Sequence, residues 1–268
     1  MSAAVRGLIA ASLIAAPFAI ADRANAATEC RSVIHRAYLT GFDEEQPAGI
    51  ARSAHWGWGA ELDASVTADS RVVLVHDARL TRITDGADRR KVSDLTYAQV
   101  RQVPLAKGGR VLGWWDAVRT AKRSGARLMV EVKDYSSNEA LWEAGGLDVL
   151  ANAIRMQGMT KRVYLGGAGA SDMLRDRYPD LRTYIRVSSA VTPLEDVAGH
   201  ELVKLLDASL NPGNIAALKA AGHGVTSARV TLTTDPDWIR GAHADGINVF
   251  FTNRGGFVHR ACQKASTP

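Results

Sequence analysis

Short apolar runs alternate with amphipathic stretches along most of the chain. Eight runs of five to seven residues favour strands: 32–36, 60–64, 128–133, 162–166, 181–187, 201–207, 225–231 and 247–252. Helix-like patterns lie between most of them, at 47–55, 115–124, 140–156, 213–221 and 236–244. Eight strands alternating with helices predict parallel βα units. We therefore expect the α/β class and a single (β/α)8 TIM barrel.

One segment interrupts this alternation. Residues 65–112 hold an extra strand at 71–76 and a turn-rich basic stretch, which predicts a small insertion after the second strand. A doubly wound open sheet is the alternative fold. Against it, no GxGxxG motif follows the first strand.

The N-terminal residues are typical of a secretory signal. Arg6 precedes an apolar run at 7–21, and Ala24-Asn25-Ala26 forms a small-x-small cleavage site. We expect residues 1–26 to be a signal peptide cleaved after Ala26, leaving a secreted or periplasmic domain at 27–268. An uncleaved membrane anchor is the alternative, but the run is short for spanning a bilayer. Cys30 and Cys262 are the only cysteines, and an oxidising compartment predicts a disulfide between them.

Composition and charge narrow the class of function. The 268 residues are 46% hydrophobic and 23% charged, which is globular composition and excludes a disordered protein. The net charge of +5 falls to +4 when Arg6, Arg23 and Asp22 leave with residues 1–26. That is too small to indicate a nucleic-acid partner, and the basic cluster at 79–91 is most simply a solvated loop.

Acidic side chains lie at alternate positions in two predicted strands. Glu61 and Asp63 are in the second strand, and Glu131 and Lys133 end the third. Residues two apart on a strand point to one face, so both carboxylates of the second strand face the same way. Close carboxylates repel unless a cation joins them, and an all-oxygen set suits Mg2+ or Ca2+ better than zinc. A structural salt-bridge layer involving Lys133 is the alternative.

Two histidines lie at the ends of neighbouring segments. His35 and Arg36 end the first strand, and His76 ends the extra strand. The structural alternative is an ordinary hydrogen-bonded core histidine for His35, and a turn capped by Asp77 for His76. Beside one divalent metal, His35 and His76 can share acid and base roles, while Arg36 and Lys133 supply positive charge for a phosphate. This combination predicts a small anionic phosphodiester as substrate.

The motifs Ile34-His35-Arg36, Glu61-Leu62-Asp63, His76-Asp77 and Glu131-Val132-Lys133 resemble those of the glycerophosphodiester phosphodiesterase family. The spacings match as well: 26 residues from His35 to Glu61, 13 from Asp63 to His76 and 55 from His76 to Glu131. A Leu-x-Arg-x-Thr-x-Gly run at 80–86 and Asp245-Gly246-Ile247 also agree, and Glu45-Gln46-Pro47 stands at the family's Glu-Asn-Thr. The resemblance covers nearly all of residues 27–268 and is strong over about 33–134.

The resemblance implies a barrel with an inserted subdomain and one divalent cation, Mg2+ or Ca2+. By position, Glu61, Asp63 and Glu131 would hold the metal, His35 and His76 would be acid and base, and Arg36 and Lys133 would bind phosphate. It also implies hydrolysis of glycerophosphodiesters to glycerol phosphate and an alcohol, in which a substrate hydroxyl can attack first and give a cyclic phosphate. Ala37, Thr231-Leu232 and Asn253 depart from the usual Gly, Trp-Thr and Asp, which leaves the alcohol group open.

Two other functions remain alternatives. A phospholipase D/C-like enzyme acting on lysophospholipid or sphingomyelin would use exposed apolar residues at the barrel mouth in transient contact with a membrane surface. The candidates for these are Trp114, Trp115 and Tyr135. An inactive secreted barrel that binds phosphate esters is the other alternative, and the intact set of seven polar residues speaks against it. The chain has no GxSxG, P-loop or HExxH motif.

Overall fold

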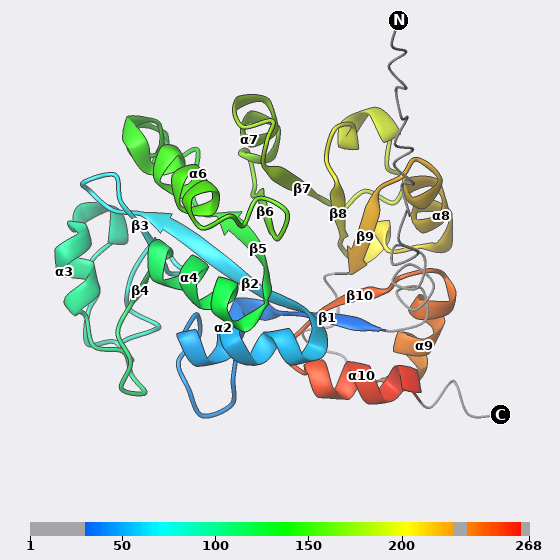
Figure 1. The fold of residues 1–268 in the computed structure, drawn as a ribbon, viewed down its shortest axis with the longest axis horizontal. Helices are drawn as coiled ribbons and strands as arrows, with labels where there is room; N and C mark the ends of the chain where they lie inside the picture. The colour runs from blue at the N-terminus through cyan, green and yellow to red at the C-terminus, as the bar shows by residue number, and fades with distance from the viewer. Residues whose placement is uncertain (1–29, 228–234, 264–268) are drawn as a thin grey trace, which may run out of the picture.

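Eight parallel strands close into a barrel, which confirms the predicted (β/α)8 fold (Figure 1). The structure is a computed structural model that describes residues 30–227 and 235–263. In ring order the strands are β1 (Arg31–Ile34), β2 (Gly57–Val66), β5 (Arg127–Val132), β6 (Val163–Gly166), β7 (Arg182–Val187), β8 (Leu202–Leu205), β9 (Gly224–Ser227) and β10 (Val249–Thr252). Because β1 pairs with both β10 and β2, the sheet is closed and the open-sheet alternative is wrong.

Helices follow most strands and cover the outside of the barrel. They are α2 (Pro47–Ser53), α4 (Trp114–Ser124), α5 (Glu139–Leu141), α6 (Leu147–Met156), α7 (Ser171–Arg177), α8 (Pro212–Ala220), α9 (Pro236–Ala244) and α10 (Gly255–Gln263). The local sequence determines where several of these helices begin. Proline occupies the first turn of α2, α8 and α9, and the side chains of Asn211 and Asp235 cap α8 and α9.

Several predicted bounds differ from the structure, with local causes. The first strand ends at Ile34, because Arg36 and Ala37 adopt φ values of 51° and 47° and form a turn, η2 (His35–Ala37). The helix predicted at 140–156 is interrupted at Gly145, whose φ of 143° separates α6 from the preceding turns. The seventh predicted strand begins as β9, and its remainder at 228–231 lies outside the described residues. The short helices α7 and α10 were not predicted.

The insertion extends the barrel sheet by two antiparallel strands. β3 (Val72–Leu74) pairs with the far end of β2, and β4 (Leu112–Gly113) pairs with β3. Between them lies α3 (Tyr97–Gln102), which Thr96 and Gln99 start with a capping box. A separate apolar cluster, including Leu80, Val92 and Val100, packs inside this segment. The end of β3 therefore has a fixed place beside β2.

The predicted disulfide between Cys30 and Cys262 is present, and it joins the residue before β1 to α10. The cysteines are 232 residues apart in sequence. The predicted signal peptide at 1–26 lies outside the described residues. Within the described ranges, no helix has the length and apolar character needed to cross a bilayer.

Candidate active site

Three carboxylates converge at the barrel mouth, as the sequence predicts. Asp63 on β2 pairs in register with Glu131 on the neighbouring strand β5, and Glu61 lies two residues earlier on β2. One oxygen from each of the three side chains lies within 4.8 Å of the others. Glu61 and Asp63 are almost fully buried, and Glu131 is 13% exposed at its side chain. Three negative groups this close form a site that attracts a cation.

Unpartnered polar atoms at this cluster fit a metal ion. Both carboxylate oxygens of Asp63 are buried without a hydrogen-bond partner among the described residues, and so are Arg36 Nε and the Tyr184 hydroxyl. Burial, and next the charge of Glu61, raises the pKa of Asp63 to about 8. A divalent cation would coordinate these buried oxygens of Asp63 and favour the ionised form of its carboxyl group.

Glu45 is a fourth carboxylate, which the sequence marked only as part of a motif. It is 2% exposed, and both of its oxygens accept from the Asp63 backbone N–H, at 3.1 and 3.2 Å. Burial and the nearby Asp63 raise the pKa of Glu45 well above its ordinary value. Glu45 holds the β2 backbone from the loop after β1, so it positions Asp63.

The two predicted phosphate-binding cations are paired with carboxylates. Lys133 Nζ lies 3.0 Å from Glu131 and 3.7 Å from Asp63, while Arg36 Nε lies 3.5 Å from Asp63. The salt-bridge layer that was the alternative to a metal is therefore present. It is also incomplete, because Glu45, Glu61, Asp63 and Glu131 outnumber these two cations. This cluster thus combines a structural ion-pair layer with a set of carboxylates that could hold a metal ion.

His35 is placed beside the cluster by the turn after β1. The backbone N–H of Arg36 donates to Glu61 Oε2 at 2.9 Å, which fixes the turn to β2. His35 Nδ1 lies 3.2 Å from Asn253 Oδ1 at the end of β10. Burial is the main cause that lowers the pKa of His35. The ring is therefore mainly neutral at pH 7 and can accept a proton.

His76 lies two residues after the end of β3. The residue between them, Val75, donates its backbone N–H to the Asp63 carbonyl at 3.0 Å. His76 Nδ1 lies 2.6 Å from Asp77 Oδ1, and Arg82 Nε donates to the other oxygen of Asp77. The bond at Nδ1 orients the ring and leaves Nε2 for another partner. Asp77 therefore serves as the residue that positions His76.

Polar residues on β7 and β8 also lie near the cluster, although the sequence analysis did not single them out. Arg186 and Lys204 are partners in register, and Tyr184 lies two residues before Arg186. Arg186 comes within 4.0 Å of Glu131, and Lys204 is 5% exposed. The period-two alternation that identified Glu61 and Asp63 applies equally to Tyr184 and Arg186. This alternation is the sequence signal that could have identified these residues.

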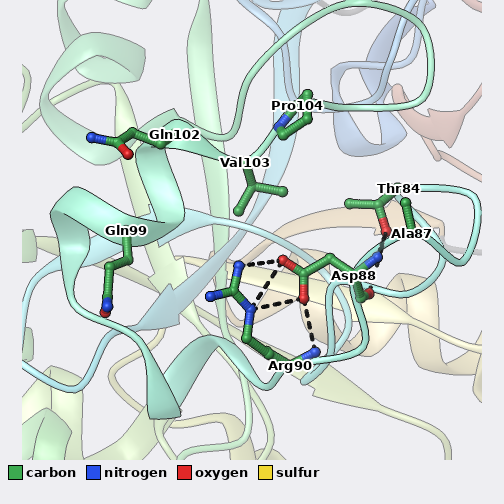
Figure 2. Close-up of a pocket in the computed structure, with 8 residues that line it drawn as sticks. All are labelled: Thr84, Ala87, Asp88, Arg90, Gln99, Gln102, Val103 and Pro104. Carbon is green, nitrogen blue, oxygen red and sulfur yellow. Dashed lines mark hydrogen bonds and ion pairs between the residues drawn. The ribbon is translucent and has the colours of Figure 1, made fainter.

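A pocket of about 310 Å3 lies in the insertion rather than at this cluster (Figure 2). Thr84, Gln99 and Val103 contribute to its wall, and none of the predicted site residues does. Its two charged residues, Asp88 and Arg90, bind each other, as Figure 2 shows. The pocket therefore offers no free charge for a ligand, and the candidate site remains the carboxylate cluster.

Comparison with known families agrees with this geometry. The model of the glycerophosphoryl diester phosphodiesterase family matches residues 57–251. The chain belongs to this family. The matched stretch of this family member contains Glu61, Asp63, His76, Glu131 and Lys133, whereas His35 and Arg36 precede it.

Individual relatives cover different shares of the chain. Glycerophosphodiester phosphodiesterase 1 of Bos taurus is 37% identical over 81 residues, which are 30% of this chain and 24% of that protein. The match thus spans about a quarter of the length of this curated relative. A glycerophosphodiester phosphodiesterase structure from Parabacteroides distasonis has a TM-score of 0.75 at 17% identity and covers 90% of this chain and 99% of its own.

A second solved structure shares the fold. It is a phosphodiesterase from Oleispira antarctica in complex with the product sn-glycerol-3-phosphate. Its TM-score is 0.71 at 17% identity, with 88% of this chain and 97% of that chain covered. At these identities the two structures show a common barrel.

Proposed function

We propose that this chain is a metal-dependent phosphodiesterase that hydrolyses glycerophosphodiesters to glycerol phosphate and an alcohol. The observation that carries the proposal is the convergence of Glu61, Asp63 and Glu131, with two buried oxygens on Asp63 that accept no hydrogen bond from the described residues. Family membership supports the reaction class. The barrel shared with the Oleispira antarctica enzyme, which was solved with sn-glycerol-3-phosphate, supports the substrate class.

In this proposal the two histidines exchange protons with the substrate. His35, kept neutral by burial, accepts a proton from the attacking hydroxyl. That hydroxyl belongs either to water or to the glycerol part of the substrate. In the second case the alcohol leaves as a cyclic phosphate forms, and water then opens the ring to give glycerol phosphate. His76, oriented by Asp77, donates a proton from Nε2 to the leaving alcohol.

Glu61, Asp63 and Glu131 would hold one divalent cation, Mg2+ or Ca2+. Their all-oxygen donor set suits either of these ions. When bound, the cation would polarise the phosphoryl oxygens. Arg36 and Lys133 would orient the carboxylates and bind the phosphate from the same side.

We also propose that the chain is exported, with residues 1–26 as a cleaved signal peptide and 27–268 as the secreted or periplasmic domain. The disulfide between Cys30 and Cys262 supports this, because such bonds persist in oxidising compartments. N-terminal sequencing of the exported protein tests it, and a mature chain that starts at Met1 would contradict it.

The decisive assay is a panel of glycerophosphodiesters measured with Mg2+ and Ca2+ separately, with identification of every phosphate-bearing product. We expect turnover that EDTA abolishes and a divalent cation restores. His35→Ala and His76→Ala should each lower kcat roughly 10²- to 10⁴-fold without unfolding the protein. His55→Ala, an exposed histidine, is the matched control and should keep full activity.

Two outcomes would contradict the proposal. An enzyme that is indifferent to EDTA would not use the carboxylate cluster for a metal. Full activity of either catalytic variant would remove the acid–base roles of His35 and His76.

Action on lysophospholipids or sphingomyelin is the second candidate function, and exposed apolar residues favour it. The residues proposed for membrane contact from the sequence are wrong in two cases, because Trp114 is fully buried and Tyr135 is 9% exposed. Instead, Tyr38 and Phe42 are exposed in the loop after β1, and Val191 is exposed after β7. Loops after parallel strands lie at the barrel mouth.

Liposome binding and release of choline from sphingomyelin test this candidate. Phe42→Ser should weaken both if the mouth contacts a membrane surface. Equal turnover of short water-soluble diesters and lipids, with no liposome binding, would argue for the first candidate alone.

A further inference from the structure

Lys204 is a buried cation on the side of the barrel opposite the carboxylates. It lies on β8, four strands from β2 around the ring of eight, so its side chain enters from the wall that faces Glu61 and Asp63. The residue is 5% exposed. Its Nζ lies 3.7 Å from the centroid of the Phe251 ring, which belongs to the apolar cluster inside the barrel. The ammonium group is thus held in the interior below the mouth.

This cation lacks an anionic partner in the described part of the chain. Among the side chains that the structure describes, no carboxylate oxygen forms an ion pair with Lys204 Nζ, and Nζ donates no hydrogen bond. Buried charges in proteins are normally paired or hydrogen-bonded. The face of Phe251 compensates only part of the lost hydration. The position of Lys204 therefore calls for an anion from outside the protein.

The other interior cations differ from Lys204 in this respect. Lys133 binds Glu131 at 3.0 Å, and Arg36 lies between Asp63 and Glu44 at 3.5 and 3.4 Å. The positive charges of Lys133 and Arg36 are partly neutralised by these neighbouring carboxylates. Of these three cations, only Lys204 has no carboxylate ion partner among the described side chains.

We infer that Lys204 is a substrate-binding residue that contacts the phosphoryl oxygens from the β8 side, across the site from Lys133. This inference rests on the proposed function, because the phosphodiester is the anion that it assigns to Lys204. The charge of Lys204 acts on both sides of the proposed phosphate position. It adds to burial in lowering the pKa of His35, and together with Lys133 it lowers the pKa of Glu131 against the effect of burial.

The location also predicts how Lys204 contributes to rate. Negative charge on the phosphoryl oxygens is redistributed in the transition state, and a fixed cation in a water-poor site stabilises it without rearranging. Loss of Lys204 should therefore lower kcat as well as weaken substrate binding.

The test compares Lys204→Met with Lys122→Met, which removes the same charge from an exposed site on α4. Binding of sn-glycerol 3-phosphate is measured by calorimetry in the presence of Mg2+, and turnover of glycerophosphocholine is measured in parallel. We expect Lys204→Met to weaken binding of the probe roughly tenfold to a hundredfold and to lower kcat, while Lys122→Met leaves both unchanged. Lys204→Gln, a polar variant, should show the same losses and covers the case in which the methionine variant fails to fold.

The outcomes separate this inference from the proposed function. If the wild-type protein turns over diesters and a folded Lys204 variant binds the probe as tightly as the wild type, Lys204 is not a phosphate ligand. If the wild type turns over no phosphodiester, the proposed function fails, and the calorimetric comparison still decides whether Lys204 binds a phosphate ester. If Lys122→Met lost as much binding and turnover as Lys204→Met, the losses would be due to net charge alone, and the inference would be overturned.

Discussion

The substitution Asp63→Asn keeps the shape of a buried side chain and removes its negative charge. In the metal-free protein this charge is costly, because Asp63 is 1% exposed, lies beside Glu61 and Glu131, and has no hydrogen-bond partner for either oxygen among the described residues. An amide at this position can donate to a neighbouring carboxylate. We therefore expect Asp63→Asn to stabilise the metal-free protein and to abolish its activity.

The magnitude follows from the pKa of Asp63. Burial, then Glu61, raises it from 3.8 to about 8 in the folded state. The unfolded chain thus releases this proton near pH 4 while the folded protein retains it until about pH 8. Stability is lost as the pH rises through this window, by up to about 1.4 kcal/mol per pH unit. From about pH 5 to about pH 7, the advantage of the variant should grow by up to about 3 kcal/mol.

Urea unfolding in EDTA at several pH values measures this difference directly. Asp94→Asn, at an exposed position, is the control and should show no pH-dependent advantage. Excess Mg2+ or Ca2+ should remove most of this difference, because a ligand at about 100 times its Kd stabilises the wild type by about 2.7 kcal/mol and the variant much less. A variant that is less stable than wild type in EDTA at every pH would refute the reasoning.

Three further predictions concern the supports of the site. Gly49→Ala should destabilise the protein by about 1–3 kcal/mol or more and lower kcat, because its Cβ would lie 1.7 Å from the Ala37 carbonyl oxygen; a variant with wild-type melting and kinetics would contradict this. Cys262→Ser removes a disulfide that closes most of the chain, and it should lower the free energy of unfolding by up to about 5 kcal/mol in denaturant; an unchanged transition midpoint would show that the bond is dispensable. Asp77→Asn should lower kcat roughly 10²-fold with little change in Tm, since His76 loses its orienting carboxylate; kinetics equal to wild type would remove that role.

Much of the fold was accessible from the sequence because its signals are local. A run of apolar residues in a barrel strand is buried on both faces, and proline or a capping side chain marks several helix starts. The errors occur where backbone conformation departs from the usual regions. Arg36 and Ala37 have positive φ values without being glycine, so nothing in their identity predicted the turn that ends β1.

In the candidate site, too, some residues follow from local sequence and others only from the tertiary structure. Glu61 and Asp63 share a face because side chains alternate along any strand, and this holds before the tertiary structure is known. Glu45 differs, since it reaches the Asp63 backbone from a loop 18 residues earlier in the sequence. The motif at 45–47 marked this glutamate but not its role, so its hydrogen bonds to the Asp63 backbone could only be seen in three dimensions.

By itself, the sequence determined the barrel class, the two alternating acidic motifs and the histidines that follow their strands, because each depends on spacing along one segment. Only the tertiary structure decided which side chains meet across the barrel. Closure of β10 onto β1 brings Asn253 to His35, and the ring order places Lys204 opposite Asp63. The physical reason is that strand pairing and barrel curvature are long-range properties, and these set the distances between charges that control pKa, metal affinity and anion binding.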